Sequence, residues 1–513
     1  MSERYILGID QSTSATKAML FSDRGAILHR SDVAHAQHFP RPGWVEHDPE
    51  EIYRNAIRAV RELFAETGVD RGAIAALALA NQRETAVVWE KAGGRPVHNA
   101  VVWQCQRGEA ICGRLEARLR ERGTPDLVKE KTGLVLSPYF TASKIQWILD
   151  NVPGARGRAE RGELLCGTVD SWLVWKLTGG RTHATDYSNA SRTQLFNIEE
   201  LRWDEELLDL FSIPRSMMAE LRFSDQFFGR TDLDGLLDQA IPIAGVMGDS
   251  HAALFGQNCF AKGMAKATYG TGSSIMMNIG DRPIRSALGL VTSIAWGMGG
   301  KVEYVFEGNI NCTGATIQWL VEDLQLIASA KEAPSIAATV GDTQGVYLVP
   351  AFVGLGAPYW DSAARASITG ISRGTKKAHI VRAAEESIAY QIKDVLDLMV
   401  RESGADLPEL RVDGGPTRDA FLMRFQADIL AMPVVRSGTE ELSATGAAFM
   451  AGLAVGFWKD RTEIASLRAG GTEIRGTMEK AEIDRLYGGW KDAVARTLRG
   501  TSAGPWSAAV PRV

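Results

Sequence analysis

The chain has 513 residues, of which 45% are hydrophobic and 23% are charged, and its formal net charge is −5. Because a single hydrophobic core rarely grows past about 250–300 residues, this length predicts more than one domain. The near balance of 57 basic and 62 acidic side chains disfavours nucleic acid and anionic membranes as partners, and no apolar run approaches the roughly 20 residues that span a bilayer.

The N-terminus and the cysteines both predict a cytoplasmic protein. After residues 1–4 the chain enters an apolar stretch directly, so we expect no signal peptide. The 5 cysteines are an odd number and lack CxxC spacing, which favours reduced thiols over disulfides or a zinc site.

The first predicted element is a hairpin over residues 6–21, in which a turn of small polar residues joins two apolar strands. Backbone N–H groups in such a turn can point into one concavity and bind phosphate oxygens. Asp10 ends the first strand, where a carboxylate is costly unless it is neutralised. Either a magnesium ion held through water or hydrogen bonds from the turn amides would neutralise it. Lys17, beyond the turn, is placed to offset charge on a transferred phosphoryl group.

A helix is predicted next, followed by a buried strand. Asp48 is the expected N-cap, Pro49 takes the first helical position, and Glu51 completes a capping box. Apolar residues then recur at helical spacing as far as Phe64. The small apolar run 74–80 is typical of a buried strand, whose C-terminal end is where open α/β sheets usually bind ligands.

Three residues near the end of that strand suit a polyol. Arg83 and Glu84 could hydrogen-bond neighbouring hydroxyls, the guanidinium donating and the carboxylate accepting. The alternative for this pair is a surface ion pair of little energetic value. Trp103 follows the apolar residues 101–102, so its face could pack against the C–H side of a polyol, although most tryptophans are core residues.

Asp249 is the predicted general base. It follows the apolar run 241–247, so its carboxylate emerges at a strand end. Phosphoryl transfer needs positioning, charge neutralisation and a base that takes the hydroxyl proton. The sequence has neither a GxxxxGKS/T loop nor a His-Arg-Asp loop, which excludes the P-loop and protein-kinase designs.

The second half repeats the pattern of the first. Residues 267–278 predict a second hairpin of the same kind, about half a chain after the first. A helix capped by Thr375, a strand that ends in the glycine pair of 410–415, and a helix of small residues over 443–456 follow. Two matched hairpins predict two α/β domains, 1–253 and 254–513, facing each other across one nucleotide. The leading functions are therefore an ATP-dependent phosphotransferase and an ATPase.

Several blocks in the same order carry a resemblance over nearly the whole chain. They lie at 38–48, 81–85, 167–173, 186–193, 349–361, 413–415 and 445–448. With these blocks the chain resembles the FGGY carbohydrate kinases. The resemblance implies a duplicated actin/hexokinase-like (ribonuclease H-like) fold that closes over ATP, with Mg2+, and a small polyol.

The resemblance also implies roles for individual residues. Asp249 is implied as the base, with Arg83, Glu84, Trp103 and Tyr139 as the polyol-binding residues around it. On the nucleotide side it implies phosphate contacts at Thr13, Ser14, Lys17, Thr271 and Gly272, nucleoside contacts at Gly314, Gln318, Gly415 and Asp419, and a magnesium site at Asp10.

The chain departs from the members of the family that act on glycerol. Lys17 stands where they usually have Arg, and Asp419 where they have Asn. Ser250 and Ser274 replace a Gln and a Phe of the polyol pocket, which would enlarge it. We therefore expect phosphorylation of a terminal hydroxyl of glycerol or a closely related small polyol, and the alternative is a four-carbon polyol or ketose such as threitol, erythritol or erythrulose.

Two interpretations from other classes remain open at this point. A mechanical or chaperone-like ATPase on the same fold would hydrolyse ATP without any polyol, and the joint presence of Arg83, Glu84, Trp103 and Asp249 argues against it. A catalytically silent binding protein would bind ATP and polyol without forming product. The family likeness further implies a homo-oligomer, either a dimer or a tetramer.

Overall fold

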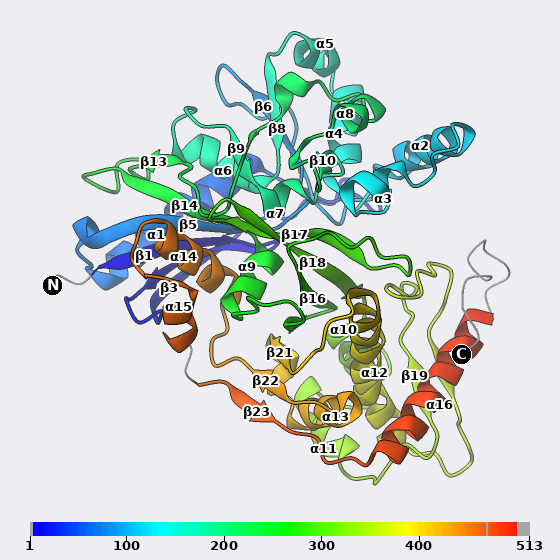
Figure 1. Ribbon diagram of the computed structural model, residues 1–513. Helices are drawn as coiled ribbons and strands as arrows, with labels where there is room; N and C mark the ends of the chain where they lie inside the picture. The colour runs from blue at the N-terminus through cyan, green and yellow to red at the C-terminus, as the bar shows by residue number, and fades with distance from the viewer. Residues whose placement is uncertain (1–3, 468–469, 500–513) are drawn as a thin grey trace.

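The computed structural model describes residues 4–467 and 470–499 and contains two large mixed sheets (Figure 1). In the first sheet, three strands form an antiparallel meander and two more run parallel to its first strand. The strand order is β13-β14-β5-β1-β2-β3. The strands are β1 (Tyr5–Gln11), β2 (Ala15–Phe21), β3 (Ile27–Ala34), β5 (Ile74–Asn81), β13 (Gly229–Thr231) and β14 (Ile241–Gly248).

The second sheet repeats this plan. β15, β16 and β18 form the antiparallel meander, and β21 and β22 run parallel to β15 and to each other. The repetition confirms a duplicated actin/hexokinase-like fold. The strands of this sheet, in the order β17-β18-β16-β15-β21-β22-β23, are β15 (Ala265–Tyr269), β16 (Ser273–Gly280), β17 (Val291–Met298), β18 (Lys301–Ile310), β21 (Leu410–Asp413), β22 (Val434–Arg436) and β23 (Thr472–Ile474).

A long insertion separates β5 from β14 and lies at the top of Figure 1, above the first sheet. It carries much of the wall around the predicted polyol residues. Its elements are β6 (Val87–Glu90), β7 (Ala100–Val101), α2 (Glu109–Glu121), α3 (Leu127–Thr132), α4 (Thr141–Asn151), α5 (Ala155–Glu160), β8 (Leu164–Gly167), α6 (Val169–Leu177), β9 (Ala184–Asp186), α7 (Tyr187–Ala190), β10 (Phe196–Asn197), β11 (Arg202–Trp203), α8 (Glu205–Leu210) and β12 (Glu220–Arg222).

Crossover helices connect the meander of each half to its parallel strands. In the first half this helix is α1 (Pro49–Thr67), which packs its apolar stripe against the first sheet. Ile52, Val60 and Leu63 of that stripe are fully buried. Burial of such side chains is worth about 1.5–3 kcal/mol each. The remaining elements are β4 (Glu46–His47), α9 (Asp249–Gly256), α10 (Gly314–Glu322), α11 (Ala333–Ala337), β19 (Tyr347–Val349), β20 (Ser367–Thr369), α12 (Lys377–Ser403), α13 (Ala420–Leu430), α14 (Leu442–Ala454), α15 (Arg461–Leu467) and α16 (Lys480–Arg499).

Helices α9 and α14 pack against each other between the two sheets (Figure 1). Although α14 belongs to the end of the chain, it packs on β5, β14 and β1 of the first sheet. At Gly446 a Cβ atom would lie 1.8 Å from the Ala252 carbonyl oxygen, so only glycine permits this approach. The predicted division between residues 253 and 254 falls within α9, which continues through it, and that boundary stays a prediction.

Two predicted helix caps differ in detail from the structure. Asp48 is confirmed as the N-cap of α1 and accepts a hydrogen bond from the backbone N–H of Glu50 at 2.9 Å. The capping box was wrong, because Glu51 instead accepts from the backbone N–H of Ala36 at 3.0 Å. The N-cap of α12 is Lys376, not Thr375, whose hydroxyl accepts from the backbone N–H of Ser372.

Two further expectations concerned reduced cysteines and the absence of a membrane-spanning segment. All five cysteines are buried thiols. Among residues 4–467 and 470–499, no helix is both long and apolar enough to cross a bilayer.

Candidate active site

The first predicted phosphate hairpin is the turn between β1 and β2, and polar side chains support it. The Trp103 indole N–H donates to the Thr13 hydroxyl at 2.9 Å, and the His35 ring nitrogen Nε2 lies 2.9 Å from the Thr13 carbonyl oxygen. Ser12 closes the turn through its N–H, which donates to the Ala15 carbonyl at 2.9 Å. Ser14 is exposed at the tip, where a ligand can reach it.

The second hairpin, between β15 and β16, is supported by backbone instead. The Thr271 carbonyl accepts from the N–H groups of Thr313 and Ala315 at 2.9 and 3.1 Å, and Gly314 N–H donates to the Gly270 carbonyl at 2.9 Å. The N–H groups at the N-terminus of α10 are thus used to hold the hairpin, and the helix dipole at this end still favours anions. A Cβ atom on Gly272 would lie 2.3 Å from the Ile310 carbonyl oxygen.

Asp10 and Lys17 face each other beside the first hairpin. Asp10 is only 5% exposed, and its Oδ1 accepts no hydrogen bond within the described part of the chain. The turn amides therefore do not satisfy this oxygen. Burial raises the pKa of Asp10 to about 7, while Lys17 opposes that rise and Asp249 adds to it. Lys17 Nζ lies 3.9 Å from Asp10 Oδ2 but donates at 2.7 Å to Glu441, a residue that the sequence analysis missed.

Arg83 and Glu84 form part of a buried charge cluster at the end of β5. Arg83 is 6% exposed and Glu84 2%, which excludes the alternative of a surface ion pair. Both terminal nitrogens of Arg83 donate to Glu307, at 2.7 and 3.0 Å, and Arg83 Nε lies 3.2 Å from Asp249 Oδ1. Arg192 donates from Nε to Glu84 at 2.6 Å. Neither Glu307 nor Arg192 was singled out from the sequence.

The charges in this cluster shift one another's protonation. Burial raises the pKa of Glu84 above its ordinary value, against the opposing effects of Arg192 and Arg83. Burial acts in the same sense on Glu307, but Arg192 and Arg83 more than offset it and lower the pKa of Glu307. Glu307 is therefore ionised, and it holds two guanidinium groups at once.

Asp249 is the first residue of α9, and its side chain is 31% exposed, enough to meet a substrate. Its Oδ1 accepts from the N–H of Ser250 at 2.6 Å. His251 is fully buried with Nε2 3.0 Å from the Ser293 hydroxyl. Burial, with a further contribution from Arg83, lowers the pKa of His251 well below its ordinary value, so this ring is neutral.

Aromatic rings lie beside the charge cluster. Trp103 and Tyr139 meet edge to face, with ring centroids 5.5 Å apart. Lys144 is fully buried and donates to the carbonyls of Pro138 and Phe140 at 2.8 Å each and also to that of Tyr139. Lys144 Nζ thus holds the turn that presents Tyr139, a second feature that was not predicted from the sequence.

Ser274 lies on the second sheet, close to the same cluster. On β16 it is directly opposite Asn309 of β18, so both side chains lie on one face of the sheet together with that of Glu307. The Ser274 hydroxyl is buried and has no hydrogen-bond partner among the described residues. This position supports the predicted contribution of Ser274 to the polyol pocket.

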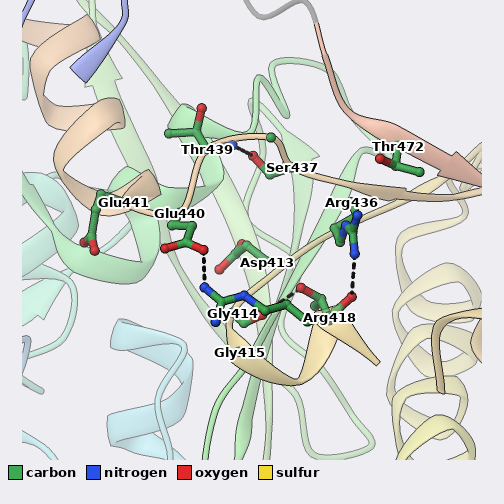
Figure 2. Close-up of a pocket in the computed structure, with 12 residues that line it drawn as sticks. Asp413, Gly414, Gly415, Arg418, Arg436, Ser437, Thr439, Glu440, Glu441 and Thr472 are labelled. Carbon is green, nitrogen blue, oxygen red and sulfur yellow. Dashed lines mark hydrogen bonds and ion pairs between the residues drawn. The ribbon is translucent and has the colours of Figure 1, made fainter. Parts of the chain in front are cut away.

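A cavity of about 470 Å³ opens where the parallel strands β21 and β22 end (Figure 2). Gly414 and Gly415 both line it, and a Cβ atom at Gly414 would lie 2.0 Å from the Tyr269 carbonyl oxygen. Arg418 pairs with Glu440 across the cavity. Of its lining residues, only Gly415 was predicted from the sequence as a nucleoside contact. The lining residues are Asp413, Gly414, Gly415, Thr417, Arg418, Arg436, Ser437, Gly438, Thr439, Glu440, Glu441 and Thr472.

The other predicted nucleoside contacts, Gly314, Gln318 and Asp419, do not line this cavity. Gly314 begins α10, and Gln318 is exposed one turn later, with its amide bonded to Glu322 at 2.9 Å. Asp419 is outside the lining of that cavity and caps α13, where it accepts from the N–H of Leu422 at 2.9 Å. Their roles stay predictions.

Comparison with known proteins agrees with this arrangement. Residues 5–256 match the N-terminal domain, and residues 265–455 the C-terminal domain, of the FGGY family of carbohydrate kinases. The glycerol kinase of Carboxydothermus hydrogenoformans is 52% identical over 496 residues, which cover 97% of this chain and 98% of that protein. Glycerol kinase 1 of Thermotoga maritima is 53% identical over 494 residues, covering 96% and 99%.

Solved structures give the same result. The Plasmodium falciparum glycerol kinase with ADP superposes with a TM-score of 0.90 at 34% identity, covering 97% of this chain and 98% of that one. Xylulose kinase from Lactobacillus acidophilus has a TM-score of 0.87 at 21% identity, covering 98% and 100%, and shares the fold. With duplicated sheets, paired hairpins and matches over both halves, the chain belongs to the FGGY family of carbohydrate kinases, which transfer a phosphoryl group to an alcohol.

Proposed function

We propose that this protein is an ATP-dependent glycerol kinase that transfers the γ-phosphoryl group of ATP to a terminal hydroxyl of glycerol. The observation that carries the proposal is the cluster of the buried Arg83 and Glu84 with the partly exposed Asp249, beside the two predicted phosphate hairpins. The relatives named glycerol kinase, at 52% and 53% identity over nearly the full chain, support the choice of substrate.

In this mechanism Asp249 takes the proton from the attacking hydroxyl. Its carboxylate is partly exposed, and Arg83 Nε and the Ser250 N–H fix its Oδ1. Its Oδ2 is then the oxygen directed to the substrate. General-base assistance of this kind contributes typically about 10²–10⁴-fold to the rate.

The polyol is held by donors and acceptors that remain after the cluster has formed. Arg192 occupies one oxygen of Glu84, which leaves Glu84 Oε2 to accept from a hydroxyl. Each terminal nitrogen of Arg83 donates once to Glu307 and keeps a second N–H. Trp103 and Tyr139 supply the apolar faces for the carbon chain.

ATP would bind with its phosphates between the hairpins, at Thr13, Ser14, Thr271 and Gly272. Lys17 would add a positive charge there, and Gly314, Gln318, Gly415 and Asp419 would contact the nucleoside. The Plasmodium falciparum enzyme, which is 34% identical to this chain and was solved with ADP, supports this choice of nucleotide.

The unpartnered Oδ1 of Asp10 fits a magnesium ion held through water. When bound, Mg2+ would neutralise charge on the nucleotide phosphates. Asp10 would orient its water shell, because the carboxylate is fixed at a strand end and is paired only weakly with Lys17, at 3.9 Å.

Glycerol is favoured over the four-carbon substrates. Ser250 and Ser274 would enlarge the pocket by their small size, but relatives that share about half of the sequence are named for glycerol. Membership in a family of carbohydrate kinases also argues against the mechanical or chaperone-like ATPase. A catalytically silent protein is disfavoured because Asp249 and both hairpins are in place.

An ADP-release assay against three- to six-carbon polyols and ketoses tests the proposal, with Mg·ATP fixed and Asp249→Asn as the blank. We expect glycerol to give the highest kcat/KM. A strong preference for erythritol, threitol or erythrulose would show that the two serines have redefined the substrate. ATP hydrolysis that no polyol stimulates would overturn the kinase assignment.

We further propose a cytoplasmic homo-oligomer, a dimer or a tetramer, on the strength of the family likeness. Light scattering of the purified protein after size-exclusion chromatography tests the oligomeric part. A single species at the monomer mass of 55.8 kDa would contradict it.

A further inference from the structure

The carboxylate of Glu307 reaches the polyol site from the other half of the molecule. Glu307 lies on β18 of the second sheet and is 2% exposed. It accepts from both terminal nitrogens of Arg83 and from Asn309 at 3.2 Å, and its Oε2 lies 3.2 Å from Arg192 Nη1. A carboxylate with this many donors holds its neighbours in one geometry.

The guanidinium groups of Arg83 and Arg192 both use the Glu307 carboxylate as an ion-pair partner. Within the described part of the chain, the acidic partners of Arg83 are Glu307 and Asp249, and the contact with Asp249 is made through Nε at 3.2 Å. Arg192 is shared between Glu84 and Glu307. Removal of one member of a buried ion pair leaves an uncompensated charge, which is destabilising and favours a new contact with another charged group.

For Arg83 the nearest other partner is Asp249. If Glu307 were neutral, the guanidinium could turn its fork onto Asp249 and occupy both oxygens of that carboxylate. The proposed base would then be blocked, and the N–H groups of Arg83 that face the polyol would be withdrawn. In the structure Glu307 instead accepts from Nη1 and Nη2, and Nε lies 3.2 Å from Asp249 Oδ1.

We propose that Glu307 is a positioning residue that acts through Arg83, keeping its fork away from Asp249 and its free N–H groups toward the polyol. The inference rests on the proposed function, because it assigns a role within the same site. It also means that the second half of the chain completes a polyol site whose other charged residues come from the first half.

The test compares Glu307→Gln with Glu303→Gln. Glu303 lies on the same strand and pairs with Arg461 at 2.8 Å and with Asn278 at 2.7 Å, away from the polyol residues. We expect kcat/KM for glycerol to fall about 100-fold in Glu307→Gln, as for other small misplacements of catalytic groups. The KM for Mg·ATP should stay within about twofold, and the control should match the wild type.

A double-mutant cycle with Arg83→Gln separates positioning from a general structural role. If Glu307 acts through Arg83, the double variant is no worse than Arg83→Gln alone, because the residue that Glu307 positions is already gone. Additive losses would overturn the proposal, as would a wild-type kcat/KM in Glu307→Gln or an equal rise in both KM values.

Two further controls cover a Glu307→Gln variant that does not fold and a wild type that prefers a polyol other than glycerol. If Glu307→Gln does not fold, Glu307→Asp retains the charge on a shorter arm, and an intermediate kcat/KM supports the proposal while wild-type kinetics contradict it. If the wild type prefers another polyol, the proposed substrate fails and the same cycle on the preferred polyol still tests Glu307. A wild type that phosphorylates nothing overturns the proposed function itself.

Discussion

The proposed polyol side and the proposed nucleotide side of this molecule are built from different groups. Around Arg83 and Asp249, the proposed recognition depends on charged side chains that hold one another through ion pairs. Around Thr271 and Gly414, it depends on backbone amides and on glycines with no room for a Cβ atom. Charged side chains can distinguish hydroxyl patterns, whereas backbone N–H groups suit phosphate oxygens that every nucleotide shares.

This contrast predicts how substitutions divide between the two substrates. Changes among the charged residues should alter kcat or the KM for glycerol. Changes at the glycines should alter the KM for Mg·ATP. Trp103 touches both sides, because its indole bonds to the Thr13 hydroxyl while its ring packs against Tyr139.

The largest expected effect is that of Asp249→Asn. The amide cannot take the hydroxyl proton, so we expect kcat to fall about 10³-fold with little change in the KM for Mg·ATP. Steady-state ADP release measures both values. Asp238→Asn, at an exposed position, is the matched control. A loss below about tenfold would remove Asp249 from the role of base.

Gly414→Ala should act on the nucleotide side. Its φ of +96° and the 2.0 Å distance from the added Cβ to the Tyr269 carbonyl oxygen force the loop to move. We expect the KM for Mg·ATP to rise about tenfold, and the strain to cost about 1–3 kcal/mol of unfolding free energy. Kinetics and urea unfolding check the two values.

The control for that change is Gly113→Ala. An added Cβ there meets nothing within 4 Å, and Gly113 lies inside α2. This variant should keep wild-type kinetics and gain about 0.5–1 kcal/mol of stability. If Gly414→Ala raised only the KM for glycerol, the division of the two sides would be wrong.

Trp103→Phe should have a smaller effect that appears on both sides. Phenylalanine keeps an aromatic face but loses the N–H that donates to Thr13. A lost hydrogen bond of about 1 kcal/mol corresponds to a rise of roughly fivefold in each KM. Initial rates at varied glycerol and varied Mg·ATP measure the two constants. A change in only one of them would show that Trp103 does not connect the two sides.

Asp170→Asn should affect stability with the least effect on activity. Asp170 is fully buried on α6 and accepts from the hydroxyls of Thr168 and Thr185 at 2.5 and 2.6 Å. Burial, and then the charge of Asp186, raise its pKa to about 7 from 3.8. Between these values the native state holds a proton that the unfolded chain has released. The wild type therefore loses stability as the pH rises from about 4 to 7.

The asparagine variant lacks this slope. Its free energy of unfolding, relative to the wild type, should increase by about 2–3 kcal/mol between pH 5 and pH 7. Urea unfolding of both proteins at the two pH values measures the difference. A difference that does not change with pH would contradict a raised pKa at Asp170.

Much of the fold could be predicted because its signals are local. The hairpins after β1 and β15, and the buried strand β5, follow from short patterns of apolar and turn residues. The packing of α14 on the first sheet depends on contacts between distant parts of the chain. The predicted caps at Glu51 and Thr375 failed because other backbone groups, at Ala36 and Ser372, use those side chains.

For the candidate site too, residues marked by a local sequence pattern could be predicted, and residues that depend on contacts between distant parts of the chain could not. Arg83, Glu84 and Asp249 could be predicted because each follows an apolar strand at its C-terminal end. Glu307 instead directly follows the apolar run 304–306 of β18, and an acidic residue in that setting was a signal that could have found it. Its pairing with Arg192 joins residues from different halves, which no local pattern indicates.

A crystal structure with glycerol, Mg2+ and a non-hydrolysable ATP analogue tests the central claim most directly. We predict a terminal glycerol hydroxyl within about 2.6–3.2 Å of the Asp249 carboxylate, facing the γ-phosphate between the two hairpins. The fork of Arg83 should remain on Glu307. Glycerol bound away from Asp249, or a nucleotide outside the hairpins, would contradict the account.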